Sequence, residues 1–255
     1  MKKFKTFVTL SLTIFLSFLS SAQEVKNYGN MKNPFDKIGQ LHNDALDYII
    51  ERNSKIDVKE ILSLADEYLK ANNSKHSFKN SIEANSETVD AYYKSGDKVN
   101  FLLNGNFLSN QGALVYVKIM NLKTSKENPA NVINKIKEIE GEIIYNKNLK
   151  EKERQLFLVA TSVYRYSIAY WTNPKNTSKW GIPNSNMHNM QSKFSWGDLA
   201  GSDVEGAIAG GIGGAFGGSV TLPVVGTVAG WVAGAAGGAI GGSAANAIGQ
   251  LTGWW

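Results

Sequence analysis

The sequence predicts an all-α protein, in which a helical bundle domain is followed by a Gly/Ala-rich helical hairpin at the C-terminus. Two observations support this fold class. Apolar residues recur at three- and four-residue intervals through the first two thirds of the chain, and glycines recur at every fourth residue near its end. Both periods place the recurring residues on one face of a helix.

The chain begins with the three parts of a secretory signal peptide, which we assign to residues 1–22. Lys2, Lys3 and Lys5 form a basic start, residues 7–19 are apolar except for Ser and Thr, and small residues end at Ala22. The apolar run is shorter than the ~20 residues of a membrane span. We therefore expect cleavage after Ala22 and an extracytoplasmic location in the periplasm, the envelope or the medium. An uncleaved N-terminal anchor is the alternative.

Charge and cysteine content exclude several classes of protein. Without residues 1–22, 24 basic residues face 22 acidic ones, and the two signs are interspersed. Nucleic-acid binding requires a concentrated basic face, so no nucleic-acid partner is predicted. The chain has no cysteine. The fold must therefore rest on a packed core rather than on disulfides.

The helical domain is predicted to span residues 23–172. Helices are expected over residues 36–53, 57–69, 86–96, 129–143 and 148–171, where apolar side chains follow helical spacing. Asp57 with Glu60, Ser86, and Asn128 before Pro129 are suitable helix starts. Residues 114–120 are almost entirely apolar and fit a buried strand or a buried helix. Their helical neighbours favour a helix.

A linker is predicted over residues 173–198. It contains Pro174, Pro183 and several Asn and Ser residues with little periodicity. It also contains Trp180 and Phe194, and a pure spacer does not need such large apolar groups. Part of the linker is therefore expected to pack on a surface.

The hairpin is predicted over residues 199–255. Its last 50 residues, 206–255, carry no charge. We expect one helix over residues 206–220, a turn at Pro223 and a second helix over residues 226–250. The predicted helix-packing face consists of glycines four residues apart: Gly206, Gly210, Gly214, Gly218, Gly226, Gly230, Gly234, Gly238 and Gly242.

The glycine face indicates close contact with another helix. A glycine inside a helix costs ~1 kcal/mol relative to alanine, and that cost is tolerable where two backbones approach each other. The contact is expected with membrane-embedded helices, with a partner helix, within the protein's own core, or between copies in a homo-oligomer. A flexible tail is a further alternative. Trp196, Trp254 and Trp255 lie at one end of the predicted hairpin, where Trp favours a membrane interface.

The tail resembles the glycine-zipper segments of class II bacteriocins. The shared residues are residues 210–214 (Gly-Gly-Ile-Gly-Gly), Pro223, and the Ala/Gly repeat that ends at Gly241 and Gly242. The resemblance implies membrane permeabilisation and covers about 50 of 255 residues. Residues 33–43 and 160–171 are similar to uncharacterised exported proteins of gram-negative bacteria.

No motif predicts a catalytic residue, a metal site or a cofactor. His42, His76 and His188 are isolated, and no acidic residue lies three or four positions from His42. The sequence leaves open whether the fold brings a Ser, a His and an Asp together as a catalytic triad. We expect an exported, non-enzymatic protein whose hairpin associates with membrane lipid, as an anchor or a permeabilising element. The alternative is an extracytoplasmic helical binding module whose hairpin packs on a partner helix or within its own core.

Overall fold

The computed structural model describes residues 27–52, 58–71, 86–122, 127–182, 195–214, 219–222 and 226–252. These residues are mainly helical, which confirms the predicted all-α class. Residues 1–22, the predicted signal peptide, lie outside them. The elements are α2 (Asp36–Arg52), α3 (Val58–Ala71), α5 (Ser86–Lys94), α6 (Lys98–Asn104), α7 (Asn110–Met120), α8 (Pro129–Tyr145), α9 (Glu151–Trp171), α10 (Pro174–Lys179), α11 (Trp196–Gly214), β1 (Ser219–Leu222), β2 (Gly226–Ala229) and α12 (Gly230–Thr252).

Side-chain caps explain where several helices begin. The Asn128 side chain accepts a hydrogen bond from the Ala130 backbone amide at the start of α8, where Pro129 occupies the first turn. The Ser109 hydroxyl does the same for Gly112 at the start of α7. The segment that fitted either a strand or a helix is therefore helical.

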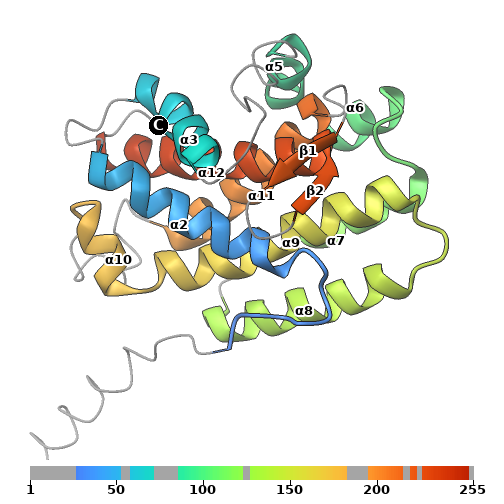
Figure 1. The fold of residues 1–255 in the computed structure, drawn as a ribbon. Coiled ribbons are helices and arrows are strands. Elements are labelled where there is room, and N and C mark those ends of the chain that lie inside the picture. The colour runs from blue at the N-terminus through green and yellow to red at the C-terminus, as the bar shows by residue number, and fades with distance from the viewer. Residues whose placement is uncertain are drawn as a thin grey trace, which may run out of the picture.

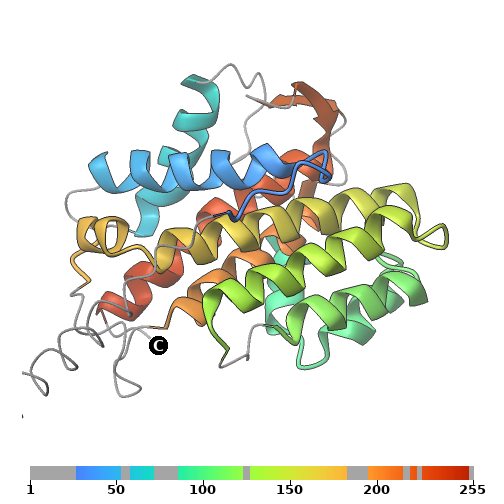
Figure 2. The ribbon, with the colours of Figure 1, turned by 90° about the horizontal axis from the view of Figure 1, so that it is seen from below.

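Helix α9 is the centre of the domain. It packs against α2, α8, α11 and α12 (Figure 1), and most of its side chains are buried. Helix α8 lies along α9 (Figure 2), at the lower edge of the molecule in the view of Figure 1. Helices α2 and α3 pack on α12, and α5 packs on α11. The two hairpin helices thus have neighbours from both the N-terminal and the central parts of the chain.

The predicted bounds of the first hairpin helix, residues 206–220, and the predicted start of the second at residue 226 are wrong. Helix α11 begins ten residues before Gly206 and ends at Gly214, and two short antiparallel strands follow instead of continued helix. Val220 pairs with Val228, and Leu222 with Gly226. Val and Thr dominate these strands, and such β-branched residues favour extended backbone over helix. The four-residue spacing of the glycines therefore continues in the sequence beyond Gly214, where α11 ends.

The first part of the predicted linker belongs to the domain. Residues 174–179 form α10, whose N-cap is the Asn173 side chain. Trp180 and Ile182 are buried in the core cluster that also holds Trp171 and Leu199. The expectation that part of this segment packs on a surface agrees with these contacts, while residues 183–194 lie outside the described part.

Candidate functional site

The predicted glycine face is a contact between the two hairpin helices themselves. Gly206 lies opposite Gly238, Gly210 opposite Gly234, and Gly214 opposite Gly230. A Cβ atom added to Gly206, Gly210, Gly214, Gly234 or Gly238 would come within 3.0 Å of a backbone carbonyl group of the other helix. Only hydrogen fits there, so these glycines set how closely α11 and α12 approach.

The remaining predicted positions do not all share this contact. A Cβ atom on Gly242 would lie 3.1 Å from the Ser202 carbonyl oxygen, at the margin of the close region. Gly230 is the first residue of α12, and its carbonyl group faces Gly214. Gly226 lies in strand β2 rather than in a helix, because the chain is extended there. Gly218 lies outside the described residues.

The other faces of the hairpin are covered by the rest of the domain. Ala200, Val204, Ala207, Ile208 and Ile212 of α11 belong to one core cluster with side chains of α8 and α9. Ile240 and Ala244 of α12 belong to a second cluster with side chains of α2 and α3. The hairpin is therefore part of the hydrophobic core on both sides of its glycine contact.

Polar side chains join the two helices at the open end of the hairpin. The Asn246 amide of α12 donates to the Ser202 hydroxyl of α11. The Gln250 amide donates to the Asn246 side-chain oxygen, at 2.8 Å, and the Gln250 oxygen accepts from the Ser195 backbone amide, at 2.9 Å. These bonds fix which glycine faces which, because sliding either helix by one turn would break them.

A buried polar cluster lies beside this end, where four helices meet. Asp203 of α11 and His42 of α2 are both fully buried, and the His42 Nε2 atom lies 3.4 Å from Asp203 Oδ2. The Ser167 hydroxyl of α9 donates to the same carboxylate oxygen. Trp171 of α9 donates from its indole nitrogen to the Ser243 hydroxyl of α12, at 3.2 Å. The cluster thus links α2 and α9 to both hairpin helices.

Burial changes the acidity of both ionisable groups. It lowers the pKa of the His42 imidazole to about 4, although the Asn43 side chain and the Ala239 backbone beside the ring act in the opposite direction. It raises the pKa of the Asp203 carboxyl to about 8, against the opposing hydrogen bonds of the nearby serines and Trp171. Both shifts favour the uncharged form of the group concerned.

Ser167, Asp203 and His42 are the residue types of a catalytic triad, but their order is different. In a triad the histidine lies between the serine and the carboxylate. Here the carboxylate lies between the other two, and the serine hydroxyl is bound to the carboxylate rather than to the imidazole. All three residues are fully buried. The arrangement stabilises contacts between helices and does not activate the serine as a nucleophile.

A second buried network holds the N-terminal segment against α8 and α9. The Arg165 guanidinium donates to Glu140, at 3.0 Å, to Asp36, at 2.5 Å, and to the Tyr28 carbonyl oxygen. The Glu140 carboxylate also accepts from Asn30 and Asn33, at 2.6 and 2.7 Å. Arg165 and Glu140 are both fully buried. Their charges are compensated within the network, as burial requires.

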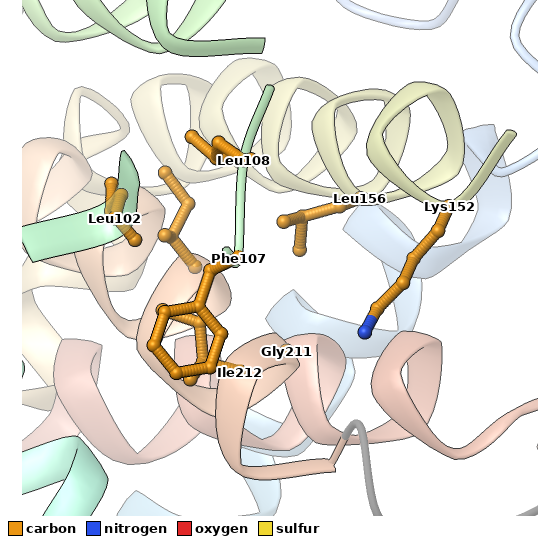
Figure 3. Close-up of a pocket in the computed structure, with 8 residues that line it drawn as sticks. Leu102, Phe107, Leu108, Lys152, Leu156, Gly211 and Ile212 are labelled. Carbon is orange, nitrogen blue, oxygen red and sulfur yellow. The ribbon is translucent and has the colours of Figure 1, made fainter. Parts of the chain in front are cut away.

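An apolar recess opens between α6, α9 and α11. Figure 3 shows Leu102, Phe107 and Leu156 on its walls, with the Lys152 side chain extending from α9 toward α11. Its free volume is about 10 Å³, roughly what one water molecule needs. The recess is therefore too small to hold an organic ligand in this conformation.

Of the three predicted membrane-interface residues, Trp196 alone lies in the described part of the chain. Trp196 begins α11 and is partly buried against both core clusters. Trp254, Trp255, His76 and His188 lie outside the described residues. No helix among the described residues has the length and apolar character needed to cross a bilayer. The described His, Asp and Glu side chains form no group of three that would hold a metal ion.

Comparison of the chain with family models, curated proteins and solved structures gives no match.

Sequence reasoning did not find the two buried polar networks. His42 and Asp203 are 161 positions apart in the sequence, and Arg165 is joined to residues near the other end of the chain. The only available signal was the presence of polar residues within apolar helical stripes, such as Ser167 and Asp203. That pattern marks a buried polar group but does not identify its partner.

Proposed function

We propose that the protein is an exported, non-enzymatic helical module that acts by binding, and that its glycine hairpin is a permanent part of its own core. The observation that carries this proposal is the reciprocal contact between glycines of α11 and α12. The face expected to meet another helix is already occupied within the chain. Partner binding then falls to the surface of the domain.

The polar groups on the hairpin support the same proposal. The stretches free of polar and charged side chains are residues 206–214 of α11 and residues 230–242 of α12. At 1.5 Å per residue these are about 13 and 20 Å long, short of the ~30 Å hydrocarbon layer. Asp203, close to the start of the first stretch, and Ser243, directly after the second, are bound to α2 and α9. Lipid would offer these groups no such partners.

Carbonate extraction of envelopes from the native host tests the location of the hairpin. We expect the mature protein to appear in the supernatant, and the purified protein not to float with liposomes at neutral pH. Residues 1–22 should be missing from its intact mass. Carbonate-resistant pelleting of the folded protein would contradict the proposal, as would flotation with lipid.

Membrane association is the second candidate function, because residues 206–255 carry no charge. It requires the domain to open, since the hairpin helices are enclosed by α2, α3, α5 and α9. Dye leakage from liposomes, measured with native protein and with protein diluted from urea, separates the two candidates. Leakage only after unfolding favours a stored membrane-active hairpin, and no leakage in either case favours the permanent core.

Exposed apolar side chains on α7 and α8 are the first positions at which to test binding. Leu114 and Tyr145 are 65% and 78% exposed, and each lies one turn from the Lys118–Glu142 ion pair that connects the two helices. Leu114→Glu and Tyr145→Glu are expected to leave the melting temperature nearly unchanged and to reduce chemical cross-linking to envelope proteins. Asn131→Glu, at another exposed position on α8, is the control. Equal cross-linking of all variants would exclude this face.

A further inference from the structure

We propose that His42 and Asp203 share one proton and that this proton holds α2 on the glycine hairpin. The inference rests on the proposed role of the hairpin as the core and adds a way to regulate it. His42 comes from α2 and Asp203 from α11, so the pair connects a covering helix to the hairpin. Their facing atoms are 3.4 Å apart and fully buried.

The geometry favours a pair with no net charge. Among the described residues, neither His42 Nε2 nor Asp203 Oδ1 has a hydrogen-bond partner, and Tyr164 OH nearby also has none. A carboxylate without the proton would be a buried charge with only neutral groups beside it, which is strongly unfavourable. An imidazolium facing a protonated carboxyl would likewise be a buried charge with only neutral groups beside it.

Other titratable groups also face the pair or lie on the helices that pack around it. Tyr164 of α9 and Tyr93 of α5 face Asp203 and are phenols, which stay protonated in this range. Helix α12 contributes only uncharged side chains. Asp66 of α3 is paired with Lys70, and Glu205 of α11 faces the tyrosines of α5 and α7.

The shared proton predicts an unusual dependence of stability on pH. In the unfolded chain both groups have their ordinary pKa values, 3.8 for Asp and 6.5 for His, whereas burial raises the pKa of Asp203 to about 8 and lowers that of His42 to about 4. Between pH 4 and 6.5 the folded and unfolded pairs each hold one proton, so stability is constant. Between pH 6.5 and 8 only the folded pair holds one, so stability falls as the pH rises.

Urea denaturation of the mature protein from pH 5 to pH 8 tests the proposal. The folding equilibrium constant of the wild type is expected to be flat up to pH 6.5 and then to fall about 30-fold by pH 8. Asp203→Asn removes the alkaline fall, because an amide does not ionise. The folding equilibrium constant of this variant should instead fall about tenfold per pH unit as the pH drops from 6.5 to 5. In that range His42 takes up a proton in the unfolded chain but not in the folded one.

His42→Gln is the complementary variant and keeps the test decisive if Asp203→Asn does not fold. It leaves Asp203 alone, so the folding constant should fall about tenfold per pH unit as the pH rises from 5 to 6.5, where the wild type is flat. Wild-type profiles in both variants would overturn the shared proton, as would a wild-type stability that rises between pH 5 and 6.5. Neither outcome affects carbonate extraction, so the two proposals fail separately.

Discussion

Replacing Gly234 by alanine is expected to lower the free energy of unfolding by about 2 kcal/mol. The new methyl group would meet the Gly210 carbonyl oxygen, and the α11–α12 pair would have to separate. Overpacking usually costs about 1–3 kcal/mol, and a contact this close lies at the upper end of that range. The better helix propensity of alanine offsets ~1 kcal/mol of the cost. Gly210→Ala should behave in the same way from the opposite helix. Urea denaturation measures both.

Gly141→Ala is the matched control. Gly141 lies inside α8, and a Cβ atom there would meet nothing within 4 Å. The substitution should therefore increase stability by about 0.5–1 kcal/mol, through helix propensity and a less flexible unfolded chain. If Gly234→Ala were as harmless as Gly141→Ala, the close contact between the hairpin helices would not exist.

Arg165→Met is expected to lower the free energy of unfolding by about 3–5 kcal/mol. It removes the ion-pair partner of the fully buried Glu140 carboxylate and leaves the two asparagine amides as its hydrogen-bond donors. Breaking a buried ion pair from one side costs this much because the remaining charge is uncompensated. Chemical denaturation at neutral pH gives the value.

The control for this substitution is Lys118→Met, which breaks the ion pair with Glu142 between α7 and α8. Both partners are at least half exposed, and surface pairs contribute between 0 and about 1 kcal/mol. Losses of similar size in the two variants would contradict the assignment of Arg165 as a buried structural group. The double variant Arg165→Met/Glu140→Met should recover part of the lost stability, because it removes the orphaned carboxylate.

The longer helices of the domain could be predicted because their signals are local, whereas the short helices α6 and α10 were not predicted. Asn128 before Pro129 marked the start of α8, and the apolar spacing up to Trp171 marked α9. The end of α11 could not be predicted from the glycine period, because that period continues through the segment that forms β1 and β2. There the β-branched Val and Thr residues outweigh the spacing.

The pairing of particular glycines was also beyond prediction. A repeat of four residues makes several registers of α11 against α12 equivalent, and only the polar contacts near Ser202, such as that of Asn246, distinguish them. Likewise, nothing in the sequence shows that His42 and Asp203 meet. The apolar spacing around each residue indicates that it is buried, but it does not indicate which residue lies opposite. Networks of this kind depend on the three-dimensional assembly of distant segments.

The Arg165 network has a consequence for the order in which the domain assembles. Tyr28, Asn30 and Asn33 are among the earliest described residues to be synthesised, yet their partners Glu140 and Arg165 follow more than 100 positions later. Local helices such as α2 can form as they appear, but the segment before α2 has to remain unattached until two thirds of the chain exists. Contacts of such long range slow folding, because a large loop must be closed before they form. The first part of the domain to leave the ribosome is thus one of the last to be fixed in place.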